Sequence, residues 1–127
     1  MKVEDATEVV RLTVPAELEC VRIVRLTASA IATRFGFDFE EVEDIRIAVD
    51  ELASLLLERA GPGELQLEFH GSPESLRVTG RAPANGRTDM CVEPLTAQVL
   101  RAVIDDYELD RIDDHICFAC TSRRLSF

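Results

Sequence analysis

The stretch IRIAVDELASLLLERA, residues 45–60, decides the fold of this chain. Its apolar residues recur at spacings of three and four, which is the period of one face of an α-helix. The stripe begins slightly upstream and consists of Val42, Ile45, Val49, Leu52 and Leu56. The run ends at Gly61-Pro62-Gly63, a strong stop signal. The segment therefore predicts a long amphipathic helix that packs one face on a core.

The residues before this helix define its start. Asp38 is a suitable N-cap with Glu41 three positions later, and Phe37 can pack on Val42 as a hydrophobic staple. A second helical stripe precedes it over residues 17–35, made of Cys20, Val24, Ala28, Ile31 and Phe35. Gly36 ends that helix. Its other side carries a second apolar ridge of Ile23, Leu26 and Ala30, so this helix can cover a sheet and also meet a partner.

The rest of the chain reads mainly as strands. Strand patterns are predicted over residues 8–16, 64–69 and 75–80, and residues 81–89 are predicted to be a loop. Helical spacing returns at Val92, Leu95, Val99 and Val103. The C-terminal stretch from Glu108 predicts two strands joined by a turn at Asp113-Asp114. This order predicts an α+β two-layer sandwich, with a mainly antiparallel sheet and helices on one face.

The composition of the chain excludes several classes of protein and of binding partner. The chain has 127 residues and a hydrophobic share of 46%, which suits a single domain over 1–127. Neither a membrane span nor a secretory signal is visible, so a cytoplasmic location is expected. The net charge of −10 argues against nucleic acid or anionic membrane as the direct partner, because both require a basic footprint. A basic protein is the partner that such a surface favours.

The helix at 45–60, placed after a first helix and before a β-hairpin, resembles the second long helix of Bergerat-fold (GHKL-type) ATPases. More narrowly, the chain is similar to the anti-sigma factor serine kinases, the RsbW-like and SpoIIAB-like proteins, including divergent actinobacterial UsfX-like members. Their helix reads roughly AV-x-E-A-x-T-N-x-x-x-H. The resemblance implies that Glu51 matches the glutamate that acts as general base on the serine of an anti-anti-sigma protein.

The other family positions are altered. Leu55 stands where the resemblance places the Mg²⁺-coordinating asparagine, and Arg59 replaces the histidine. Leucine offers no oxygen to a hard cation. The adenine-binding D-x-G-x-G box has no counterpart in residues 78–86, and no glycine follows Gly86 to form a phosphate cradle. We therefore expect a degenerate pocket without a cofactor, and ATP with Mg²⁺ only if kinase activity persists.

Two site interpretations compete with simpler ones. Glu51 forms a helical stripe with Ser54 and Glu58, which a partly solvated helix face also explains. His115-x-Cys117-x-x-Cys120 suggests zinc, yet a structural site needs four ligands, and Cys117 and Cys120 point to opposite faces of a strand. The chain's four cysteines are therefore expected to be free thiols, with no metal site.

The leading hypothesis is an anti-sigma factor that sequesters a sigma factor by direct binding. Release would come from a competing anti-anti-sigma protein of the STAS type, and the resemblance implies a homodimer. The candidate partner-binding residues are Arg22, Ile23, Arg25, Leu26, Asp110 and Asp113. The alternatives are an active serine kinase with Glu51 as base, a non-enzymatic dimeric scaffold that pairs with a related kinase, and, more distantly, a zinc or redox regulator.

Overall fold

A computed structural model describes residues 8–86 and 90–124. The strands are β1 (Glu8–Pro15), β2 (Glu64–Gly71), β3 (Ser75–Pro83), β4 (Asp106–Ile112) and β5 (His115–Arg123). The helices are α1 (Val21–Arg34), α2 (Phe39–Arg59) and α3 (Pro94–Val103), and a 3-10 turn, η2 (Leu18–Cys20), precedes α1.

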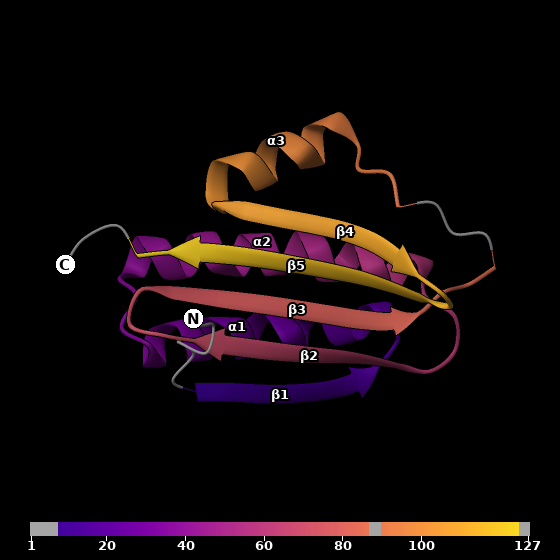
Figure 1. The fold of residues 1–127 in the computed structure, drawn as a ribbon, viewed down its shortest axis with the longest axis horizontal. Helices are drawn as coiled ribbons and strands as arrows, with labels where there is room; N and C mark the ends of the chain where they lie inside the picture. The colour runs from indigo at the N-terminus through magenta and orange to yellow at the C-terminus, as the bar shows by residue number, and fades with distance from the viewer. Residues whose placement is uncertain (1–7, 87–89, 125–127) are drawn as a thin grey trace.

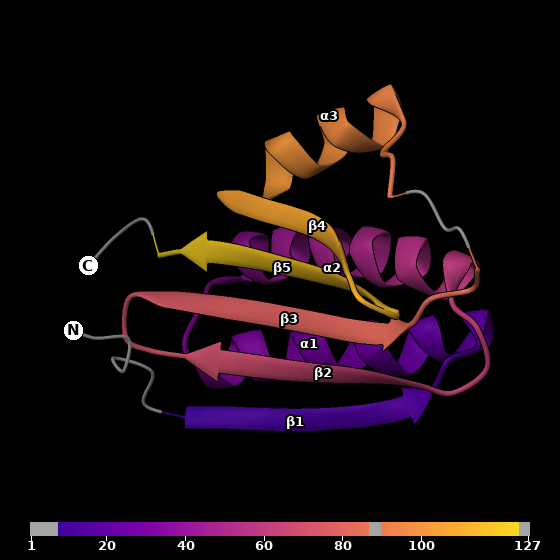
Figure 2. The same cartoon turned by 45° about the vertical axis from the view of Figure 1, so that its right-hand side comes forward.

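The strands form one sheet in the order β1-β2-β3-β5-β4, and every neighbouring pair is antiparallel. Helices α1 and α2 lie side by side behind this sheet, and α3 lies beyond its β4 edge (Figure 1). The turned view keeps the same two layers (Figure 2). The predicted α+β sandwich with an antiparallel sheet and helices on one face is confirmed.

The core lies between the two layers. In β2 the burial alternates, so that Leu65, Leu67 and Phe69 face the helices while Gln66 and Glu68 face away. Every residue of the predicted α2 stripe is buried: Val42, Ile45, Val49, Leu52 and Leu56. The long helix is thus held by its apolar face, as its spacing predicted.

The turn between α1 and α2 follows its local signals. The Asp38 carboxylate accepts a hydrogen bond from the Glu41 amide, and the Glu41 carboxylate accepts one from the Asp38 amide, each at 2.8 Å. This reciprocal capping box satisfies two amides that the helix leaves unpaired. Gly36 has φ +88°, a conformation that favours glycine, so it ends α1 as predicted.

Two predicted boundaries are wrong. The first helix does not begin at Glu17, whose backbone is extended; the first turn is the 3-10 turn η2. Residues 81–83 are strand rather than loop, because β5 continues alongside β3 and pairs with Arg81, Ala82 and Pro83. The partner strand and the burial of Ala82 outweigh the turn-forming residues nearby. The final part of that predicted loop, 87–89, lies outside the described residues.

The predicted apolar stripe of α3 is also partly wrong. Leu95 is 71% exposed, whereas Leu100 is fully buried and faces the core. The side of α3 that contains Leu100 packs on the core, so Leu95 on another side of the helix is left exposed. Within the described residues, no helix is long and apolar enough to span a membrane.

Candidate functional site between α2 and α3

One face of α2 and the start of α3 enclose a pocket of about 320 Å³. From α2 it is lined by Glu51, Ser54, Leu55, Glu58 and Arg59, and from the chain leading into α3 by Cys91, Glu93 and Thr96. The α2 residues share one side of the helix because their spacings are three and four. Glu51, the predicted general base, is half-buried in this pocket.

Arg59 crosses the end of this pocket. Its guanidinium donates to the Leu55 carbonyl oxygen at 3.2 Å and to the Cys91 carbonyl oxygen at 3.4 Å. It also lies 3.9 Å from a carboxylate oxygen of Glu58. One side chain therefore links the last turn of α2 to the segment before α3.

The residues present do not fit a magnesium–nucleotide complex. Among the described residues, the pocket walls carry three carboxylates, Glu51, Glu58 and Glu93, and one cation, Arg59. A helix N-terminus can hold phosphate, but the N-terminus of α3 at this pocket carries the Glu93 carboxylate at its N-cap and Pro94, which lacks an amide proton, at its first position. The excess of carboxylates therefore disfavours phosphate. Leu55 is 7% exposed and brings methyl groups to the position where the sequence resemblance places a metal-coordinating amide.

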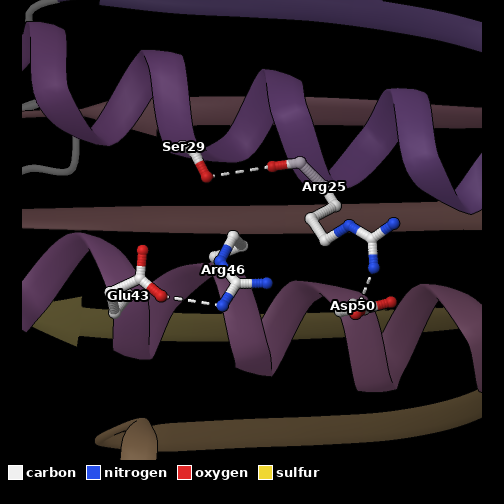
Figure 3. A network of polar contacts seen from close by, with 5 residues as sticks. All are labelled: Arg25, Ser29, Glu43, Arg46 and Asp50. Atoms are coloured by element: carbon white, nitrogen blue, oxygen red, sulfur yellow. Dashed lines mark hydrogen bonds and ion pairs between the residues drawn. The ribbon is translucent and has the colours of Figure 1, made fainter.

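Arg25 has an intramolecular role. Its guanidinium lies 3.0 Å from the Asp50 carboxylate, and this half-buried ion pair joins α1 to α2 (Figure 3). A second pair, Arg46 with Glu43 at 2.7 Å, stays within α2. Polar side chains therefore join the two helices at this point, and Asp50 accepts a structural hydrogen bond from Arg25.

The other candidate residues of α1 are exposed. Ile23 is 48% exposed and Leu26 is 62% exposed, and they form a surface that we call the α1 ridge: Leu18, Arg22, Ile23, Leu26 and Ala30. Residues 21–34 include three arginines and no acidic residue, although the whole chain has a net charge of −10. Two of these arginines, Arg25 and Arg34, are paired with Asp50 and Glu8, so the α1 ridge is an apolar surface with one arginine, Arg22, on an acidic protein.

Asp110 and Asp113 lie away from this ridge. Asp110 is exposed on β4, and Asp113 occupies the β4–β5 turn with φ +56°. Helix α1 lies behind the sheet toward β1, whereas β4 is the opposite edge strand (Figure 2). The structure therefore divides the predicted partner-binding residues between two separate surfaces.

The cysteines do not form a site together. Cys120 faces the core, where burial raises its pKa to about 12. Cys117 is on the other face of β5, and burial also raises its pKa. In the part of the chain that the structure describes, no group of three or more His, Cys, Asp or Glu side chains could hold a metal ion. All four cysteines are free thiols.

Sequence reasoning found the α2 side of the pocket and missed its other wall. Glu93 and Thr96 are separated from α2 in the chain by strands β2 and β3, and only the docking of α3 on α2 brings them to Glu51. The bridging role of Arg59 was missed for the same reason. Its position in the last turn of α2 was the one available signal.

Comparison with known proteins agrees with this geometry. The model of the histidine kinase-like ATPase domain matches residues 14–111, most of the chain. The chain belongs to this family. Among solved structures, a Mycobacterium tuberculosis protein with RsbU and RsbW domains shares the fold with a TM-score of 0.74, at 14% identity, over 92% of this chain and 32% of that one.

Curated relatives of this histidine kinase-like ATPase domain are named serine-protein kinase RsbW. One from Halalkalibacterium halodurans is 43% identical over 65 residues, covering 50% of this chain and 40% of the relative. One from Bacillus cereus strain B4264 is 34% identical over 112 residues, covering 86% of this chain and 65% of the relative. The chain spans about half the length of such relatives. The RsbW-like resemblance inferred from the sequence is confirmed.

Proposed function

We propose that this RsbW-like domain is an anti-sigma factor that acts by binding and does not use ATP. The observation that supports this most strongly is the pocket between α2 and α3. It keeps Glu51 but surrounds it with two further carboxylates, the buried Leu55 and the bridging Arg59. A carboxylate base needs a positioned phosphoryl donor, and this lining disfavours one.

The mechanism is occlusion. A sigma factor bound to this domain in the cytoplasm would be held away from RNA polymerase, and an anti-anti-sigma protein of the STAS type would release it by competing for the domain. Such a switch depends on relative affinities alone. The α1 ridge and the acidic side of β4 are the two candidate contact surfaces for these partners, and competition requires that the two partners share at least one of them.

A second candidate function is a serine kinase with Glu51 as general base. Its support is the position of Glu51, half-buried in the pocket and facing the start of α3. ATP and Mg²⁺ would then have to bind without the usual asparagine and glycine positions. The two functions differ in whether activity requires ATP.

The test uses the full chain immobilised on a surface and each purified sigma factor of the source organism, with nucleotide removed by EDTA and apyrase. We expect retention of one sigma factor at submicromolar concentration, unchanged by millimolar Mg²⁺–ATP and reversed by a STAS-domain protein. Retention that appears only with ATP, or phosphate transfer to the STAS protein that Glu51→Ala abolishes, would favour the kinase. If the chain retains no sigma factor, neither the binding-only anti-sigma function nor an ATP-dependent anti-sigma function holds.

A further inference from the structure

The sheet has an open face with a hollow of about 430 Å³ in it. In the described part of the chain, the helices lie behind the sheet or beyond its β4 edge, and none covers this face (Figure 1). The hollow extends over four neighbouring strands, β2, β3, β5 and β4. It is separate from the pocket between α2 and α3, which lies on the helical side.

The shape of the hollow matches a helix. Its floor consists of the small side chains Thr79, Cys117 and Ala119 on β3 and β5, with Arg81 at one end opposite Cys117, and its walls are formed by β2 and β4. The walls are three strand spacings apart, about 14 Å. An α-helix with its side chains is about 10–12 Å wide. A single helix can therefore rest on the floor between the walls.

The β4 wall is the acidic one, with Glu108 and Asp110 both exposed on it. On the β2 wall, Glu68 is already paired with Arg11 at 3.2 Å and contacts His70 at 3.0 Å. Arg81 stands on β3 between the two walls and is the one cation among the described lining residues. The small floor residues beside the acidic β4 wall are complementary to a helix with an apolar ridge and a basic flank that faces β4.

We propose that this hollow is a docking site for a basic amphipathic helix of a partner protein. Ile112, 56% exposed at the end of the β4 wall, adds apolar contact area beside the carboxylates. The stems of lysine or arginine side chains would pack on these apolar groups while their charged ends reach Glu108 and Asp110. The proposal rests on the proposed function only for identifying the partner as a sigma factor, whose DNA-binding helices have this character.

Two other occupants fit the hollow less well. Nucleic acid is repelled by the acidic β4 wall. A second copy placed face to face would set one hollow against another, with no ridge to fill either. A second copy could insert its α1 ridge instead, but that contact is head-to-tail and would generate a ring or an open chain of molecules rather than a two-fold dimer.

The experiment measures binding of the full chain to a fluorescein-labelled helical peptide of about 18 residues, long enough to span the strands. The peptide carries leucine and alanine on one stripe and lysine on both flanks, and a second peptide carries glutamate in place of lysine. We expect binding of the lysine peptide only. We also expect amide chemical-shift changes in NMR spectra to centre on Thr79, Cys117 and Ala119.

Two pairs of variants, each with its own control, localise the site. Glu108→Lys combined with Asp110→Lys should weaken peptide binding about tenfold or more. Glu17→Lys combined with Glu19→Lys is the matched control, because it changes the net charge equally at exposed positions outside the hollow, and it should change binding less than twofold. Ala119→Trp should fill the floor and block binding, while Ala30→Trp on α1 should not.

Equal losses in the two charge-reversed variants would show that only net charge matters and would overturn the proposal. Shift changes confined to α1 would also overturn it. The proposal would also be overturned if sedimentation showed a dimer of the wild type that Ala119→Trp converts to a monomer. The open face of the sheet would then bind a second copy of the chain. If the peptide binds in the hollow but no sigma factor binds the chain, the proposed function fails and the docking site stands.

Discussion

Gly80 lies in the middle of β3, where its missing side chain makes room for the ring of Phe118 on β5. A Cβ at this position would lie 2.5 Å from Phe118 Cε2, far inside van der Waals contact. Both residues are buried, so neither the ring nor the strand has free space to move into. The packing of the Phe118 ring against β3 on the core side of the sheet depends on this glycine.

We therefore predict that Gly80→Ala lowers the free energy of unfolding by about 1–3 kcal/mol, the usual cost of overpacking a core. Urea unfolding followed by circular dichroism measures the change. The matched control is a double-mutant cycle with Phe118→Leu, in which the smaller side chain should recover part of the loss. Strict additivity of the two changes would contradict the steric explanation.

Cys120 gives the protein a dependence on alkaline pH. Burial raises the pKa of its thiol to about 12, above its ordinary value of 9.0. The unfolded chain therefore loses this proton first as pH rises, and stability present below pH 9 declines toward pH 12. The slope contributed by this one thiol is at most about 1.4 kcal/mol per pH unit.

The unfolding free energies of the wild type and of Cys120→Ala are measured between pH 7.5 and 10.5. The quantity of interest is the difference between the two proteins at each pH. That difference should shrink above pH 9, since the variant lacks the titrating group. In the same range a thiol reagent should modify the exposed Cys91 quickly and Cys120 only on unfolding. A constant difference between the two proteins would show that the thiol is not buried.

The helices show which structural features local sequence signals can predict. The start of α2 could be predicted from Asp38 and Glu41, and its buried face from spacing alone, because both signals lie within the helix. The end of β3 could not, since Pro83 reads as a loop residue until β5 pairs with it. The exposure of Leu95 on α3 likewise depends on how α3 meets α2, which periodicity does not encode.

The same distinction between local signals and tertiary packing applies to the candidate functional site. Glu51, Leu55 and Arg59 were identifiable because they share one helix, whereas Glu93 and the hollow on the open face arise from tertiary packing. Arg25 was predicted as a partner-binding residue from its position on α1, yet its ion pair with Asp50 gives it a structural role. A single sequence gives no pairing information for two helices that lie side by side.

The exposed α1 ridge supports a prediction about partner binding by one helix. Arg22→Glu combined with Leu26→Glu should weaken retention of a sigma factor or STAS-domain partner by about tenfold or more, because exposed apolar and arginine side chains dominate many interfaces. The unfolding free energy should change little, since both side chains face solvent. Surface plasmon resonance and urea unfolding of the same variant measure the two effects.

Arg101→Glu on α3 is the control for this variant, because it reverses one exposed arginine on a different element. It should leave retention within about twofold of the wild type. A loss equal to that of the α1 variant would mean that overall charge, and not the α1 ridge, governs binding. Unchanged retention in both variants would remove α1 from the interface.

At the scale of the whole molecule, the net charge of −10 governs encounters with other proteins. We predict that the association rate constant with a basic partner falls about tenfold or more between roughly 0.05 and 0.5 M salt, because salt screens long-range attraction. The dissociation rate constant should change less. Stopped-flow fluorescence separates the two, and a Glu108→Gln/Asp110→Asn variant should show a shallower dependence. An association rate that ignores salt would contradict electrostatic steering.

We propose that this histidine kinase-like ATPase domain acts by binding a protein partner and does not bind nucleotide. The decisive measurement is thermal unfolding of the full chain with and without millimolar Mg²⁺–ATP, repeated with ADP. We predict an unchanged Tm, because the acidic lining of Glu51, Glu58 and Glu93 and the buried Leu55 do not fit the ligand. A ligand at about 100 times its Kd would add roughly 2.7 kcal/mol, so a Tm rise of several degrees would contradict the account.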